Sequence, residues 1–267
     1  MINYSGIFVK SIFVLATVGM VFSACVTTPT GRKQLVMLPA SQMNNMGVQA
    51  YSDMKKKEKI SKDRKLTNIV VEVGKRIARA SGANYKWEFT LFDSDKVNAF
   101  CLPGGKIGIY TGILPVAKNT AGLAAIMGHE VGHAIARHSN ERVSQQLMLA
   151  GGLGLAGVAL HKNKNRNLIM AGLGLGAGLG IMLPFSRKHE SEADTIGLKY
   201  MAKAGYDPKE ASKLWQRMNK KGGGGPPEIL STHPHPTNRS NALKNQVSDV
   251  WALYQKSNKQ STKSIPL

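Results

Sequence analysis

Residues 127–138 read MGHEVGHAIARH and place two histidines four positions apart within an apolar run. Residues four apart on an α-helix lie on one face, one turn from each other, so His129 and His133 can bind the same ion. Glu130 lies about 100° around that helix, close enough to hold a water molecule bound to the ion. This HExxH arrangement predicts a zinc site on a helix.

The residues around the motif predict that this helix is buried. Apolar side chains recur at about one-turn spacing at Leu123, Ile126, Met127, Val131 and Ile135. The spacing predicts an uninterrupted helix from residue 120 to about residue 147. Polar groups in an apolar stripe cost stability unless a partner satisfies them, which favours a bound ion over two core histidines.

A catalytic zinc ion needs three protein ligands and one open position, so the chain must supply a third ligand elsewhere. A metzincin is excluded because Ala136 and Ser139 stand where that motif requires glycine and histidine. The later stretch RKHESEAD offers Glu190 and Asp194, again four apart on a predicted helix. Glu190 can bind the ion while Asp194 accepts a hydrogen bond from the outer nitrogen of a zinc histidine. The alternative is an ordinary solvated acidic pair.

Short strands precede the motif helix. The stretch KWEFTLF alternates with a period of two, and VNAFCLPGGKIGIYTG contains two further strands separated by Pro103 and two glycines. Together with the helical patterns that follow, they predict an α+β fold that is mainly helical. We expect a zincin domain, gluzincin-like, with a small antiparallel or mixed sheet and the HExxH motif on its active-site helix.

The N-terminus is typical of an exported protein. Residues 7–24 are almost continuously apolar and end in small residues before Cys25, which predicts a signal peptide over residues 1–24. The stretch VFSAC resembles the lipobox of bacterial lipoproteins, in which the new N-terminal cysteine is acylated. Val26, which is not aspartate, favours sorting to the outer membrane. The alternative is an uncleaved anchor helix.

The sequence predicts one metallopeptidase domain, which covers residues 46–258. Residues 25–45 are predicted to be a lipid-anchored linker and residues 259–267 a disordered tail. Two Gly-rich apolar stretches within residues 147–185 predict a mobile flap or a membrane-associated insert. A transmembrane pair is the less favoured alternative. A single crossing of the membrane would place His133 and Glu190 on opposite sides of it.

Cysteine content and charge limit the function further. If Cys25 carries lipid, Cys101 is the only other cysteine, so the chain has no intrachain disulfide. Cys101 lies in an apolar strand pattern and is expected to be a core residue. The 36 Lys and Arg residues against 16 Asp and Glu residues give a net charge of +20, which suits anionic membrane lipid. No nucleic-acid-binding motif accompanies this charge.

Four segments resemble the zinc metallopeptidase family that contains the HtpX membrane proteases, the CAAX prenyl proteases and the mitochondrial overlapping-activity peptidase. These segments are NAFCLPGGKIGIYTGIL, HEVGHAIARH, LPFSRKHESEADTIGLKYMAKAGYD and STHPHPTNR. They span residues 97–239, and the periplasmic lipoprotein branch of the family has a similar anchor, size and insert.

The resemblance implies roles for several side chains. It implies that His129, His133 and Glu190 bind one zinc ion, that Glu130 is the general base and that Asp194 orients a zinc histidine. It further implies that Asn98 and Ala99 belong to an edge strand that holds the peptide, that His233 caps the ion at rest, and that Arg239 lies near the reaction centre. His235 adds a second histidine to the same loop and leaves the capping residue open.

The sequence therefore predicts a membrane-tethered periplasmic zinc metalloendopeptidase. The family implies that it cleaves unfolded or misfolded envelope proteins, with polypeptides, anionic lipid and the outer-membrane assembly machinery as partners. One alternative is a chaperone or assembly factor for outer-membrane proteins with little proteolysis. Another is a basic lipid- or peptidoglycan-binding module whose motif is vestigial.

Overall fold

The computed structural model describes residues 25–149, 186–220, 229, 233 and 238–266. The predicted signal peptide, residues 150–185 of the Gly-rich insert, and His235 lie outside the described residues. The described elements are β1 (Cys25–Thr27), β2 (Lys33–Leu35), α2 (Ala40–Lys57), α3 (Arg64–Ser81), β3 (Glu88–Phe92), β4 (Ala99–Leu102), β5 (Lys106–Tyr110), a 3-10 turn (Thr111–Ile113), α4 (Leu114–Ala117), α5 (Thr120–Ile135), α6 (His138–Leu149), α9 (Arg187–Lys203), α10 (Lys209–Lys220) and α12 (Arg239–Lys256).

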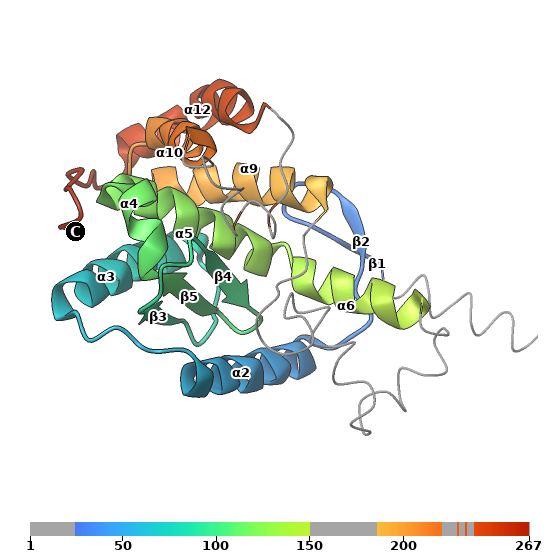
Figure 1. The fold of residues 1–267 in the computed structure, drawn as a ribbon. Coiled ribbons are helices and arrows are strands. Elements are labelled where there is room, and N and C mark those ends of the chain that lie inside the picture. The colour runs from blue at the N-terminus through green and yellow to red at the C-terminus, as the bar shows by residue number, and fades with distance from the viewer. Residues whose placement is uncertain (1–24, 150–185, 221–228, 230–232, 234–237, 267) are drawn as a thin grey trace, which may run out of the picture.

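A three-stranded mixed sheet lies between two layers of helices (Figure 1). Its order is β3-β5-β4, with β3 parallel and β4 antiparallel to β5. Successive strand residues point to opposite faces, so Phe92 and Phe100 pack with α2 in one apolar cluster. Leu91 and Ile109 pack on the other face, in the cluster that contains α3, α5 and α9. The predicted α+β, mainly helical fold with a small mixed sheet is confirmed.

The two helices that carry the predicted zinc ligands, α5 and α9, approach each other through small residues. A Cβ atom on Gly197 of α9 would lie 2.6 Å from the carbonyl carbon of Gly128 and 2.7 Å from the amide nitrogen of His129. A Cβ atom on Gly132 would lie 2.6 Å from the carbonyl oxygen of Ala193. Only glycine leaves room for this approach, which sets the distance between the histidines of α5 and the acids of α9.

The motif helix ends earlier than its apolar pattern predicts. Arg137 adopts a φ of 57°, in the left-handed region that few residues other than glycine occupy. Its amide donates to the carbonyl of Ala134 at 3.1 Å, which closes the last turn of α5, and α6 begins at His138. The expected uninterrupted helix to residue 147 is therefore wrong. The helical spacing continues on both sides of the two-residue turn formed by Ala136 and Arg137, so periodicity does not reveal the turn.

The N-terminal segment is also ordered rather than a linker. Strands β1 and β2 pair antiparallel, with Cys25 opposite Leu35, and the turn between them places Gly31 at a φ of 91°. Helix α2 already begins at Ala40. Residues 25–45 are therefore not a linker: they contain this hairpin and the start of α2, and Arg32 of the hairpin has partners on α6 and α9.

The predicted disordered tail over residues 259–267 is wrong as well. Ile265 is 5% exposed and belongs to the main apolar cluster. The amide of Thr120, at the start of α5, donates to the carbonyl of Lys263 at 2.9 Å, and Ile265 donates to Lys118 at 3.1 Å. The tail thus supplies a backbone acceptor, a backbone donor and an apolar side chain beside the start of α5. Among the described helices, none is long and apolar enough to cross a membrane.

We predict that Gly197→Ala destabilises the domain. Alanine has the higher helix propensity, by about 1 kcal/mol, but its Cβ would meet the backbone of α5, and such overpacking costs about 1–3 kcal/mol. Chemical denaturation of Gly197→Ala should show this loss. Lys199→Ala, an exposed position of the same helix, is the control and should change the free energy of unfolding by no more than about 0.5 kcal/mol. A Gly197→Ala variant as stable as the control would contradict the packing argument.

Candidate metal centre

Three elements bring four potential ligands to one point. His129 and His133 extend from α5, Glu190 extends from the first turn of α9, and His233 comes from the segment before α12. One ligand atom from each of these residues lies within 4.8 Å of every other, and all four side chains are buried. The structure therefore brings together the three predicted zinc ligands and the predicted capping histidine.

The individual distances show how tightly the atoms converge. Nε2 of His129 lies 3.0 Å from Nε2 of His133 and 3.2 Å from Oε2 of Glu190. Oε1 of Glu190 lies 3.3 Å from Nε2 of His133 and 3.0 Å from Nδ1 of His233. These are two Nε2 atoms, one Nδ1 atom and a carboxylate that point into the same small volume.

Asp194 lies behind His129, as the sequence predicts. Its Oδ1 is 2.9 Å from Nδ1 of His129, so Nδ1 donates to the carboxylate and leaves Nε2 to face the cluster. Burial and the charge of Arg239 oppose protonation of His129, but Glu190 and Asp194 outweigh them and raise its pKa to about 9. The acids thus make this position favourable for a positive charge.

The charge states of the other ligands also suit a cation. Burial disfavours the charge of Glu190, but attraction to His233 and His129 outweighs it and holds the pKa of the carboxyl well below its usual range. Burial holds the pKa of His133 well below its usual value, so that imidazole is neutral. An ionised carboxylate and a neutral imidazole are the forms that bind metal ions.

Glu130 offers a more specific test of whether a bound ion fits. The side chain is 1% exposed, and its Oε1 has no hydrogen-bond partner among the described residues. Nε2 of His233 lies 3.6 Å from that oxygen, beyond hydrogen-bond distance. A buried carboxylate oxygen without a donor is costly. A water molecule held by an ion in the cluster is a donor of the kind this oxygen needs, so the residues present fit a metal centre.

Arg239, at the start of α12, reaches the outer side of the cluster. Its Nη1 donates to Oε2 of Glu190 at 3.2 Å, and its Nη2 donates to Oδ1 of Asp194. The guanidinium lies over the ring of Trp215, 3.6 Å from the ring centroid. Trp215 was not singled out from the sequence, because it looks like one more apolar residue of α10. Its contact with Arg239 shows that it supports the site.

The predicted peptide-binding strand is an edge strand, and both named residues are buried. Ala99 begins β4, which is at the edge of the sheet, and Asn98 precedes it with 1% exposure. The carbonyl of Val97 accepts a hydrogen bond at 3.1 Å from the amide of Ile229, and Ile229 in turn accepts one from the amide of His233 at 2.8 Å. Ile229, which accepts from His233, is therefore itself hydrogen-bonded to the chain beside β4.

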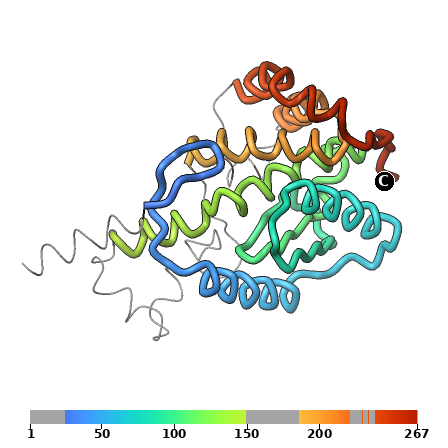
Figure 2. Tube along the Cα trace, turned by 180° about the vertical axis from the view of Figure 1, so that it is seen from behind, coloured from blue at the N-terminus to red at the C-terminus, as the bar shows by residue number. Residues whose placement is uncertain are grey.

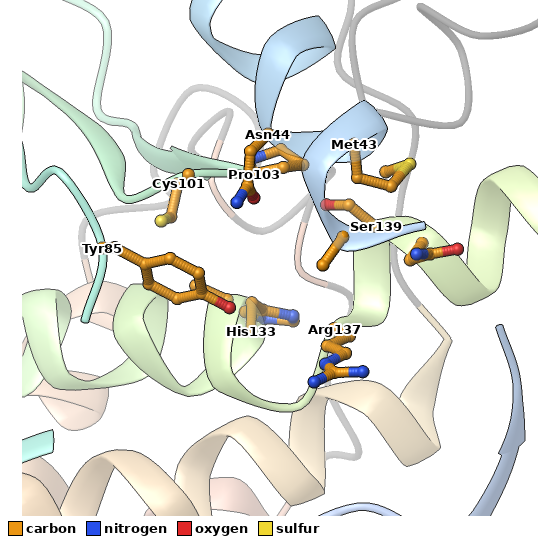
Figure 3. Close-up of a pocket in the computed structure, with 12 residues that line it drawn as sticks. Met43, Asn44, Tyr85, Cys101, Pro103, His133, Arg137 and Ser139 are labelled. Carbon is orange, nitrogen blue, oxygen red and sulfur yellow. The ribbon is translucent and has the colours of Figure 1, made fainter. Parts of the chain in front are cut away.

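A small pocket opens on the side of His133 away from α9. Figure 3 shows Tyr85 and Cys101 on one side of it, Met43 and Ser139 on the other, and His133 beneath. Its cavity volume is about 30 Å³, room for about one water molecule. Burial raises the pKa of the Cys101 thiol well above its usual value, which agrees with the expected core role of this cysteine.

Comparison with known proteins agrees with this geometry. Residues 62–247, more than half of the chain, match the family model described as peptidase family M48. The mitochondrial metalloendopeptidase OMA1 of Arabidopsis thaliana is 38% identical over 170 residues, which cover 63% of this chain and 33% of that protein. OMA1 of Schizosaccharomyces pombe is 40% identical over 178 residues, which cover 63% of this chain and 49% of that protein.

A bacterial relative aligns over more of the chain at lower identity. The beta-barrel assembly-enhancing protease of Escherichia coli K12 is 25% identical over 221 residues, which cover 80% of this chain and 45% of that protein. This chain thus spans between a third and a half of the length of these relatives.

The family match covers α5, α9 and the start of α12, and with them every residue of the four-membered cluster. The chain belongs to peptidase family M48, a family of metallopeptidases.

Proposed function

We propose that this protein is a zinc-dependent endopeptidase that cleaves unfolded polypeptides at the cell envelope. The observation that carries the proposal is the convergence of His129, His133 and Glu190 beside a buried Glu130 oxygen that has no hydrogen-bond partner among the described residues. Family membership supports a metal-dependent peptidase. The choice of zinc and the choice of substrate are inferences from the chemistry of the site.

The donor set favours zinc over the other common ions. Two imidazoles and one carboxylate are ligands typical of catalytic zinc, with a further position for water or substrate. Magnesium and calcium prefer oxygen ligands, which only Glu190 supplies in the cluster. We therefore assign zinc to His129, His133 and Glu190, with His233 as the group that can leave.

The roles of the side chains follow from their places. A divalent ion bound here supplies Lewis acidity, which lowers the pKa of water and polarises a peptide carbonyl. Oε1 of Glu130 accepts a proton from the attacking water and returns it to the leaving amine. Arg239, 5% exposed, donates to Glu190 on the outer side of the cluster, where it orients that carboxylate and adds positive charge to the site.

An extended polypeptide is the substrate that the sheet edge suits. A peptide that pairs with β4 through its main chain would be held without reference to one defined sequence. Ile229 donates to the carbonyl of Val97 beside the same edge, and His233, which donates to Ile229, contributes to the cluster.

The place of action is inferred from the N-terminus and the charge. Cys25 is an exposed thiol at the start of β1, available as the site of acylation. A net charge of +20 suits a surface held close to anionic lipid. We propose an outer-membrane lipoprotein facing the periplasm that removes misfolded envelope proteins. The name of the Escherichia coli relative, which refers to beta-barrel assembly, makes the outer-membrane assembly machinery a candidate partner.

One observation favours the alternative of a holding factor that rarely cuts. Nδ1 of His233 lies 3.2 Å from Nε2 of His129 and 3.0 Å from Oε1 of Glu190, where it would occupy the position that water needs. A chain that keeps this arrangement would bind polypeptides without hydrolysing them.

Glu130→Gln should separate the two functions. Glutamine keeps the shape but cannot accept the proton, so we expect casein hydrolysis to fall by about 10²–10⁴-fold while bound zinc stays unchanged. Glu72→Gln removes a carboxylate from an exposed pair on α3 and serves as the matched control, with unchanged hydrolysis. If the wild type degrades no casein yet prevents its aggregation as well as Glu130→Gln does, the protein is a holding factor.

Removal of single ligands should distinguish the three zinc ligands from the cap. Loss of a residue that only hydrogen-bonds to a zinc ligand lowers the affinity for zinc by about 10–100-fold. Loss of a ligand itself should cost more, so Glu190→Gln should weaken zinc binding by about 100-fold or more. His233→Ala should retain about one zinc per chain because three ligands remain. Metal analysis after dialysis against a chelator measures both. Equal zinc loss in the two variants would make His233 a permanent ligand.

A further inference from the structure

A second group of polar side chains, outside the metal cluster, connects the N-terminal hairpin to the metal site. We call it the outer cluster, and it consists of Arg32, His138, Glu141 and Glu192. Arg32 comes from the hairpin, His138 and Glu141 come from α6, and Glu192 comes from α9. The hairpin lies against α6 and the N-terminal end of α9 (Figure 2). None of these residues was singled out from the sequence.

Arg32 joins the two helices through their carboxylates. Its Nε donates to Oε2 of Glu192 at 2.7 Å, while Nη1 and Nη2 donate to the two oxygens of Glu141 at 2.9 and 2.7 Å. The Oγ1 atom of Thr30, in the same hairpin, also donates to Glu192. Both carboxylates are buried, and paired guanidinium contacts of this kind fix position as well as charge.

His138 carries the connection inwards to a metal ligand. Its Nε2 lies 3.1 Å from Oε2 of Glu192, and its Nδ1 lies 2.8 Å from Nδ1 of His133. In an unbroken helix, side chains five residues apart would point about 140° away from each other. The left-handed turn at Arg137 starts α6 in a new direction, and the rings of His133 and His138 can therefore meet.

The order of donors along this path follows from the chemistry of the imidazole. If His133 binds the ion through Nε2, its Nδ1 carries a hydrogen and donates to Nδ1 of His138. His138 then carries its own hydrogen on Nε2, which donates to the Glu192 carboxylate. Every hydrogen along this path, between the Arg32 guanidinium and the ring of His133, therefore has one defined position.

We propose that the N-terminal hairpin is part of the metal centre, with Arg32 as a positioning residue that acts through Glu192 and His138 on His133. The proposal rests on metal binding at the proposed active site. The hairpin precedes residues 62–247, which match the family, so this contribution comes from the chain outside the family domain. The competing explanation is that Arg32 only holds the hairpin in place and leaves the metal ligands unaffected.

The first test examines the wild-type protein and needs no variant. Long-range ¹H–¹⁵N correlation spectra of the zinc-loaded full chain, labelled at histidine, report which ring nitrogen carries hydrogen. We expect neutral His138 with hydrogen on Nε2, and His133 with hydrogen on Nδ1. Hydrogen on Nδ1 of His138, or on both of its nitrogens, would overturn the proposal.

The second test asks whether Arg32 affects the ion. Arg32→Met keeps the length of the side chain and removes its donors, and Lys33→Met changes the next residue of the same hairpin as the matched control. We expect zinc to dissociate up to about 10-fold faster from Arg32→Met, the lower end of the effect of losing a direct partner of a metal ligand, because Arg32 acts through Glu192 and His138. The visible spectrum of the cobalt-substituted variant should change as well. Lys33→Met should match the wild type in both measurements.

The outcomes separate this proposal from the proposed function. A wild type that binds no zinc would contradict the function itself. A wild type that binds zinc and cleaves casein, with an Arg32→Met variant of unchanged zinc dissociation and cobalt spectrum, would contradict only the role of the hairpin. A lower melting temperature of Arg32→Met with both metal measurements unchanged would show that Arg32 merely holds the hairpin.

Discussion

The close approach of α5 and α9 is the constraint on which the site depends. The backbone of Gly128 lies against that of Gly197, so the helices are too close for a Cβ atom between them. This contact sets Glu190 beside two imidazoles that are separated from it by more than fifty residues of sequence. Helix ends and loops can shift without much cost, but a backbone contact of this kind allows little adjustment.

Burial explains why the polar groups of the site form a connected network. Ionised carboxylates and an arginine are costly in the interior unless each has partners. Glu190 and Asp194 share Arg239, and the guanidinium also lies over Trp215. Because Glu190, Asp194 and Arg239 satisfy one another, a change at one of them is expected to move the others, which couples the fold to the metal ligands.

The sequence predicts those parts of the site that depend on local spacing. His129 and His133 follow from one turn of helix, and Asp194 follows from the same spacing after Glu190. The turn at Arg137 could not be predicted, because an arginine in the left-handed region has no pattern in the sequence. Arg32 was missed for a different reason: its partners are more than a hundred residues away, and only the folded chain shows them.

X-ray absorption at the zinc edge of the purified, zinc-loaded protein would test the central claim most directly, because it reports the atoms bound to the ion. The account predicts imidazole nitrogen and carboxylate oxygen near 2.0–2.1 Å and no sulfur, with about one ion per chain. Scattering from sulfur near 2.3 Å would implicate a cysteine instead and would contradict a centre built from His129, His133 and Glu190.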